Sequence, residues 1–144
     1  MYKTILLAYD GSHEGRLALR EGARLAKTCD AQVILLAVVD LNTTIAMAGT
    51  AGPGAAQHQS EDYSSVLDEG LEHLRQMGLT PQGRLENGEP VERIIATATA
   101  TGADLVVVGH HRQSLIGRWL IGSVTEALID KLPCSLLAAR NDPA

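Results

Sequence analysis

Short apolar runs restrict the fold of this chain more than any other feature. The runs QVILLAVV at residues 32–39 and LVVV at residues 105–108 are almost uninterrupted, and TILLAY at residues 4–9 is similar. Strands that are apolar on both sides belong to a sheet covered on both faces, which is the usual setting of parallel strands. The sequence therefore predicts a buried parallel sheet.

Segments with helical character alternate with these runs. Four helices are predicted, over residues 13–28, 61–77, 90–101 and 123–131. Ser12 is suited to cap the first helix, and Ser123 with Glu126 has the spacing of a capping box at the start of the last. Gly78 and Gly102 are suited to end the second and third helices.

The order of elements predicts one domain over residues 1–144. Two further strands, a weak one at residues 83–87 and a final one at residues 134–139, bring the count to five strands and four helices. Alternation of this kind implies α/β architecture, with right-handed crossovers and helices on both faces of a Rossmann-like layer. Residues 41–60 are small and lack periodicity, and we expect a mobile loop that is either a lid or an insertion without a role.

Composition argues against several classes of function. The net charge is −5 and aromatic residues make up 3% of the chain, without phenylalanine. Both features disfavour nucleic-acid binding, since phosphate backbones require cations and single strands require stacking platforms. The chain has no apolar stretch of membrane-spanning length and no signal peptide ahead of its first strand. Cys29 and Cys134 lack metal-ligand spacing, so we expect a reduced, cytoplasmic protein without a metal site.

A candidate anion site lies near the C-terminus. The run ending at Val108 stops at Gly109, and Gly122-Ser123-Val124 opens the last helix after an intervening loop. This arrangement presents backbone N–H groups to an anion. No acidic residue occurs between Leu105 and Thr125, whereas four basic or imidazole side chains do: His110, His111, Arg112 and Arg118. The segment predicts a phosphate site, although Ser123 and Gly122 are also explained as a helix cap and a turn glycine.

The ends of the first and second strands supply the other parts of a possible nucleotide site. Ligands of open α/β sheets bind beyond the carboxyl ends of the strands, where the strand order reverses. Asp10 follows the first strand and is suited to accept hydrogen bonds from a ribose, although a carboxylate at a helix start is an equally good explanation. The second strand ends at Val38-Val39, where a base is expected.

These residues resemble the universal stress protein family. Tyr9-Asp10-Gly11-Ser12 follows the N-terminal strand, as in that family, and Gly109 with Gly122-Ser123 has the spacing of its nucleotide motif, Gly-x2-Gly-x9-Gly-(Ser/Thr). Arg112 replaces the second glycine of this motif. Ala8 stands where some nucleotide-binding members have proline. The resemblance covers essentially the whole chain and implies a five-stranded sheet of order 3-2-1-4-5.

The resemblance also implies a role for each site residue. Asp10 would hold ribose, the backbone of Val38 and Val39 would face adenine, and the phosphates would be lined by Gly109, Gly122, Ser123 and Val124. Arg112 would clamp a phosphate, exclude it, or remain solvated. The last strand, from Cys134 to Ala139, would be an apolar sheet edge, which requires a partner. The family pairs last strands across a two-fold axis, so a homodimer is expected on both grounds.

Three functions are compatible with this pattern. The first is a dimeric stress-response or signalling protein that binds ATP or AMP, with Mg accompanying ATP. The second is a dimeric interaction module of the same fold, whose site is closed by Arg112. The third is a weak ATPase. The sequence shows no set of catalytic residues for this reaction, and no acidic residue near the phosphate loop to activate water.

Overall fold

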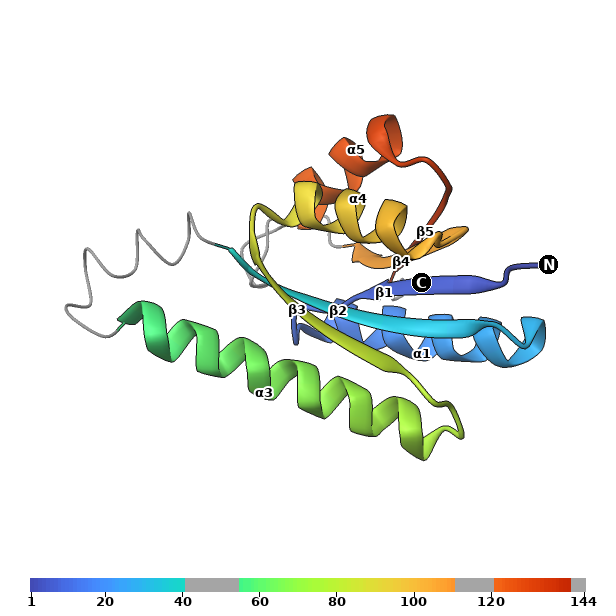
Figure 1. Ribbon diagram of the computed structural model, residues 1–144, viewed down its shortest axis with the longest axis horizontal. Coiled ribbons are helices and arrows are strands. Elements are labelled where there is room, and N and C mark those ends of the chain that lie inside the picture. The colour runs from blue at the N-terminus through green and yellow to red at the C-terminus, as the bar shows by residue number, and fades with distance from the viewer. Residues whose placement is uncertain (41–54, 111–120, 141–144) are drawn as a thin grey trace.

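A computed structural model (Figure 1) describes residues 1–40, 55–110 and 121–140 of the chain. In these ranges strands and helices alternate, as predicted. Their order is β1 (Thr4–Ala8), α1 (His13–Cys29), β2 (Gln32–Asp40), α3 (Ala55–Gln76), β3 (Gln82–Gly88), α4 (Pro90–Thr101), β4 (Leu105–His110), α5 (Ile121–Lys131) and β5 (Ser135–Arg140).

The strands form one parallel sheet of order β3-β2-β1-β4-β5, which confirms the predicted fold class and strand order. Leu6 in the central strand β1 pairs with Ile34 of β2 and Val106 of β4. All three side chains are buried, because helices cover both faces of the sheet. The apolar runs are therefore the core, as their composition indicated.

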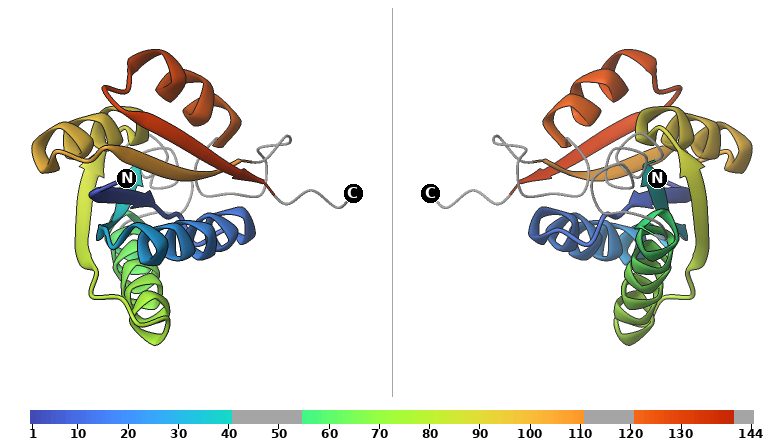
Figure 2. Two further views of the ribbon diagram at one scale, coloured as in Figure 1. Left: turned by 90° about the vertical axis from the view of Figure 1, so that its right-hand side faces the viewer. Right: turned by 90° about the vertical axis from the view of Figure 1, so that its left-hand side faces the viewer.

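The helices divide into two layers. Figures 1 and 2 show α1 and α3 on one face of the sheet and α4 and α5 on the other. Gly22 of α1 faces the side chain of Leu7, and Gly70 of α3 faces Leu35 and Tyr9. A Cβ atom at either glycine would be within 2.6 Å of a leucine carbon, so these glycines let α1 and α3 pack closely on the sheet. No described helix has the length and apolar character needed to cross a membrane.

Most helix ends agree with the sequence prediction. The Ser12 hydroxyl accepts a hydrogen bond from the N–H of Gly15 at 3.0 Å, which caps α1. Gly102 ends α4 with φ 68°, and Gly78 follows α3 with φ 89°, both in the left-handed region that glycine tolerates. The start of α4 has a cap that the sequence analysis missed: the Glu89 carboxylate accepts hydrogen bonds from the N–H groups of Val91 and Glu92.

Two helices begin earlier than predicted. Helix α3 starts at Ala55, so the predicted loop was wrong for residues 55–60, and the remainder of it, 41–54, lies outside the described residues. Helix α5 starts at Ile121, so Ser123 belongs to its first turn and the prediction of Ser123 as the cap was wrong. Once a helix has formed its first turn, each added residue gains a hydrogen bond. Alanine and glutamine, which are common in residues 55–60, favour a helix even where no apolar periodicity reveals it.

Candidate functional site

Asp10 is a buried carboxylate just beyond the end of β1. Its side chain is 1% exposed. Oδ1 accepts hydrogen bonds from the backbone N–H of Ser12, at 2.9 Å, and from the Ser12 hydroxyl. Oδ2 is buried and has no hydrogen-bond partner among the described residues. An unsatisfied buried acceptor is costly, and a donor from a ligand would remove that cost.

The turn after Asp10 holds this carboxylate in place. Gly11 has φ 82°, a conformation that favours glycine. Ser12 then donates to Asp10 and accepts from Gly15, so one hydroxyl joins the carboxylate to the first turn of α1. The sequence offered two explanations of Asp10, a helix-start carboxylate or a ligand acceptor. One carboxylate oxygen serves the helix start, and the other has no partner among the described residues.

Gly109 has a packing role that the sequence analysis did not identify. A Cβ atom on Gly109 would be 2.5 Å from the carbonyl oxygen of Glu14 and 2.8 Å from the N atom of Gly15. Both atoms belong to the backbone of the first turn of α1, which cannot yield as a flexible side chain does. Glycine is therefore required where β4 passes the start of α1, whether or not a ligand is bound.

Gly15 completes this contact between the strand tips. A Cβ atom there would be 2.9 Å from Asp10 Oδ1 and 3.2 Å from the Ser12 hydroxyl oxygen. The first turn of α1 thus touches Asp10 on one side and Gly109 on the other, as expected for residues that flank the boundary between β1 and β4. The signal in the sequence was a glycine within the first turn of a helix, where helix propensity alone disfavours it.

The predicted base-binding residues, Val38 and Val39, lie in β2. Ala8 is the last residue of β1 and pairs with Leu36, whereas β2 continues through Val38 and Val39, which pair with β3. The side chains of Ala8, Val38 and Val39 are all buried. Val38 and Val39 therefore lie two and three residues beyond the position in β2 that pairs with the end of β1.

The remaining predicted residues are only partly described. Gly122, Ser123 and Val124 lie in the first turn of α5, and the first N–H groups of a helix lack intrahelical acceptors. Gly122 and Ser123 therefore keep the backbone donors on which the anion-site prediction depends. Arg112 lies outside the described residues, as do His111 and Arg118, and its three alternative roles stay predictions.

A second polar group lies beside Asp10 on the face covered by α1 and α3. The buried Tyr9 hydroxyl donates to Glu69 Oε1 at 3.2 Å and accepts from Arg16 Nε at 3.4 Å. Arg16 also forms a salt bridge of 3.2 Å with Glu69. Burial raises the pKa of Tyr9 above its ordinary value. The sequence analysis did not predict this cluster, because its members come from separate parts of the chain: the residue after β1, helix α1 and helix α3.

The sequence as a whole matches known proteins. The model of the universal stress protein family matches residues 1–140. The putative universal stress protein SH1215 of Staphylococcus haemolyticus is 31% identical over 145 residues, which cover 98% of this chain and 86% of that protein. The putative universal stress protein SERP1273 of Staphylococcus epidermidis is 32% identical, with the same coverage.

Solved structures share the fold. The protein MJ0577 superposes with a TM-score of 0.81 at 25% identity, covering 100% of this chain and 99% of its own. A universal stress protein family member from Burkholderia pseudomallei gives 0.74 at 27% identity, covering 99% and 97%.

Three solved structures of lower identity contain nucleotides. They are a universal stress protein in complex with cAMP, an Arabidopsis thaliana family member with AMP bound, and the Archaeoglobus fulgidus protein in complex with dAMP. Each gives a TM-score of 0.69, at 15–20% identity, which establishes a common fold. The family model covers nearly the whole chain, and the relatives and solved structures agree with it. The chain belongs to the universal stress protein family.

Proposed function

We propose that this protein binds an adenine nucleotide, ATP or AMP, and acts as a homodimer in stress response or signalling. The observation that carries the proposal is Asp10 Oδ2, a buried carboxylate oxygen without a partner among the described residues. Leaving such a group unsatisfied costs about 1–3 kcal/mol. A ribose hydroxyl would donate to it, while Oδ1 stays hydrogen-bonded to Ser12.

The surrounding elements fit the other parts of a nucleotide. Adenine would lie against the backbone of Val38 and Val39, beside Ala8. The phosphates would lie between Gly109 and the first turn of α5, at the N–H groups of Gly122, Ser123 and Val124. The choice of adenine is supported by the three relatives, since cAMP, AMP and dAMP all contain that base.

The described residues offer little to a magnesium ion. No group of three or more His, Cys, Asp or Glu side chains is arranged to hold a metal within them. Asp10 Oδ1 is already committed to Ser12. We therefore propose binding without turnover. The weak ATPase alternative would require turnover above background with magnesium or manganese.

One observation favours the second candidate, an interaction module of the same fold with a closed site. The contact of Gly109 with the backbone of Glu14 explains the first glycine of the motif by packing alone. The motif spacing is therefore weaker support for nucleotide binding than the Asp10 oxygen that lacks a partner among the described residues. In this alternative Arg112 fills the phosphate position, and Arg112→Gly would create nucleotide affinity.

Mass spectrometry of small molecules that copurify with the protein is the most direct test. We expect release of an adenine nucleotide on denaturation, and loss of it when Gly122 is replaced by a bulky residue. Calorimetry with ATP, ADP, AMP and cAMP would then rank the ligands. Neither copurified nucleotide nor heat for the native chain, together with heat for Arg112→Gly, would establish the closed module instead.

The homodimer is proposed through β5. Leu136, Leu137 and Ala138 in this edge strand are only partly buried in the single chain, so its apolar residues remain available for pairing. The opposite edge strand, β3, carries Arg84 and Glu86, and charged side chains on an edge discourage pairing. The cytoplasm is the proposed location, since both cysteines are free thiols.

A further inference from the structure

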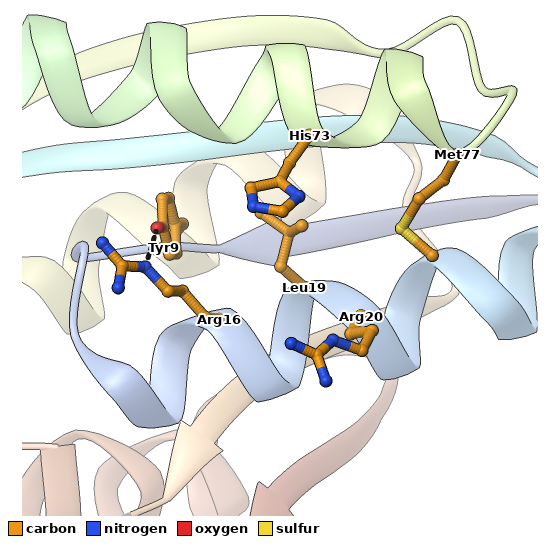
Figure 3. A pocket seen from close by; sticks show the side chains of 6 residues that line it. All are labelled: Tyr9, Arg16, Leu19, Arg20, His73 and Met77. Carbon is orange, nitrogen blue, oxygen red and sulfur yellow. Dashed lines mark hydrogen bonds between the residues drawn. The ribbon is translucent and has the colours of Figure 1, made fainter.

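A small pocket lies between α1 and α3, on the side of the sheet that Tyr9 faces. Its volume is about 40 Å³, and it is lined by Tyr9, Arg16, Leu19, Arg20, His73 and Met77. Figure 3 shows His73 of α3 reaching toward α1, which carries Arg16 and Arg20. One buried water needs about 10–15 Å³, so the pocket has room for a few waters or one small oxyanion. A nucleotide is too large for it.

The nitrogen donors of this pocket are only partly used. Arg16 is held by Tyr9 and Glu69. The Arg20 guanidinium and the His73 imidazole have no hydrogen-bond or ion-pair partner within the described parts of the chain. Arginine presents N–H donors that no change of pH in the physiological range removes, and even neutral histidine retains one N–H. Helices α1 and α3 therefore direct unused donors toward one pocket at the surface, where Arg16, Arg20 and His73 are exposed.

The charges of this pocket favour an anion. Arg16 and Arg20 bring two positive charges, and Glu69, which bonds to Arg16 and Tyr9, brings one negative charge. The surplus is positive, although the whole chain carries −5. Leu19 and Met77 supply the apolar part of the lining. Hydrogen bonds from a guanidinium to an oxyanion are charge-assisted and stronger than neutral ones.

We propose that this pocket is a second ligand site, which binds a phosphate-sized oxyanion through Arg20, His73 and the free N–H groups of Arg16. It is separate from the nucleotide site because Tyr9 lies on the face covered by α1 and α3, where a Cβ atom at Gly70 would approach its ring to 2.9 Å. Asp10, the next residue, lies at the strand tip against the start of α1.

Titration with inorganic phosphate, followed by NMR of the isotope-labelled protein, tests this site. We expect saturable shifts of the Arg20 side-chain N–H and the His73 ring, at constant ionic strength. Arg20→Gln and His73→Gln should each weaken binding about tenfold, the loss of one charge-assisted hydrogen bond. Arg24→Gln is the matched control, because Arg24 is an exposed arginine of α1 that does not line the pocket. It should bind as the native chain does.

Parallel titrations with acetate and chloride separate phosphate recognition from general attraction of anions. Equal shifts with chloride, linear shifts without saturation, or unchanged affinity in both pocket variants would overturn the proposal. Shifts confined to Gly109 and the start of α5 would also overturn it, since they would assign phosphate to the nucleotide site alone. Chemical shifts of α4 and α5 report whether each variant remains folded.

Discussion

The α-carbon of Gly109 lies so close to Glu14 that an added Cβ atom would be 2.5 Å from the Glu14 carbonyl oxygen. Strand β4 and helix α1 therefore meet backbone to backbone. The first glycine of the nucleotide motif is thus also a packing residue. Any variant at Gly109 changes the fold's stability before it changes ligand binding.

Gly109→Ala should lower the free energy of unfolding by about 1–3 kcal/mol, the usual cost of forcing extra volume into a packed site. Urea denaturation without ligand measures this. Gly102→Ala is a useful comparison, because nothing lies within 4 Å of an added Cβ and only its φ of 68° opposes alanine. Unchanged stability of Gly109→Ala would show that the contact relaxes freely, and would return the glycine to a purely ligand-binding role.

Asp10→Asn should separate binding from stability. Asparagine keeps an oxygen to accept from Ser12, but an NH₂ group replaces the orphan oxygen Oδ2 and cannot accept a ribose hydroxyl. We expect nucleotide affinity to fall at least about tenfold, because a hydrogen bond to a charged group is lost. Thermal unfolding without nucleotide should be unchanged or shifted upward, since an unsatisfied buried charge has been removed.

Ser12→Ala is the control for Asp10→Asn. It removes the α1 cap and the hydroxyl that donates to Asp10, and should cost about 1 kcal/mol of stability, while the backbone N–H of residue 12 still donates to Asp10 Oδ1. A loss of stability in Asp10→Asn as large as that in Ser12→Ala, with affinity retained, would assign Asp10 to the helix start alone.

Asp104 should make the free energy of unfolding depend on pH in the acid range. Its carboxylate accepts hydrogen bonds from the N–H groups of Lys3, at 2.9 Å, and Thr4, at 3.1 Å, which join β1 to the start of β4. The Lys3 N–H makes the largest contribution to lowering the Asp104 pKa. The folded-state pKa is thus below the unfolded one, so the stabilisation is present above about pH 4 and is lost as the pH falls through the folded pKa.

Urea denaturation of the native chain and Asp104→Asn between pH 3 and pH 7 checks this. The two stability profiles should converge toward low pH, because protonation removes the charge that distinguishes them. A constant difference across the whole range would show that the Asp104 charge has no part in the contact.

Tyr9→Phe should destabilise the fold by about 1 kcal/mol, since the buried hydroxyl bonds to both Arg16 and Glu69. Burial is the largest cause of the raised Tyr9 pKa. Stability linked to this group is present below about pH 10 and is lost as the pH rises through the folded pKa. Alkaline unfolding, followed by circular dichroism, should therefore begin at higher pH in Tyr9→Phe. Identical alkaline midpoints would contradict the assignment.

Leu137→Lys should convert the proposed dimer into a monomer, because a charge on an edge strand disfavours pairing. Sedimentation equilibrium over a range of concentrations measures the change. Leu85→Lys is the matched control, as Leu85 is an exposed leucine on the opposite edge strand, β3. A dimer that survives Leu137→Lys and dissociates in Leu85→Lys would place the interface on β3.

The sequence by itself determined the architecture of this protein. The runs at residues 32–39 and 105–108 are apolar on both sides, which only a sheet covered on both faces can bury, and glycines and Ser12 marked most helix ends. Residues 55–60 escaped prediction because helix extension from a nucleated turn needs no apolar periodicity. The sequence also predicted that the site lies at the strand ends and helix starts, because a parallel sheet brings the carboxyl ends of its strands to one edge.

Tertiary structure alone decided what each of these residues contacts. The opposing atoms come from elements distant in the chain: Glu14 against Gly109, Glu69 against Tyr9, and Lys3 against Asp104. The two oxygens of Asp10 are equivalent in the sequence and differ in the fold, where one is satisfied by Ser12 and the other is buried without a partner among the described residues. A sequence lists hydrogen-bonding groups, and only packing determines which of them remain unsatisfied.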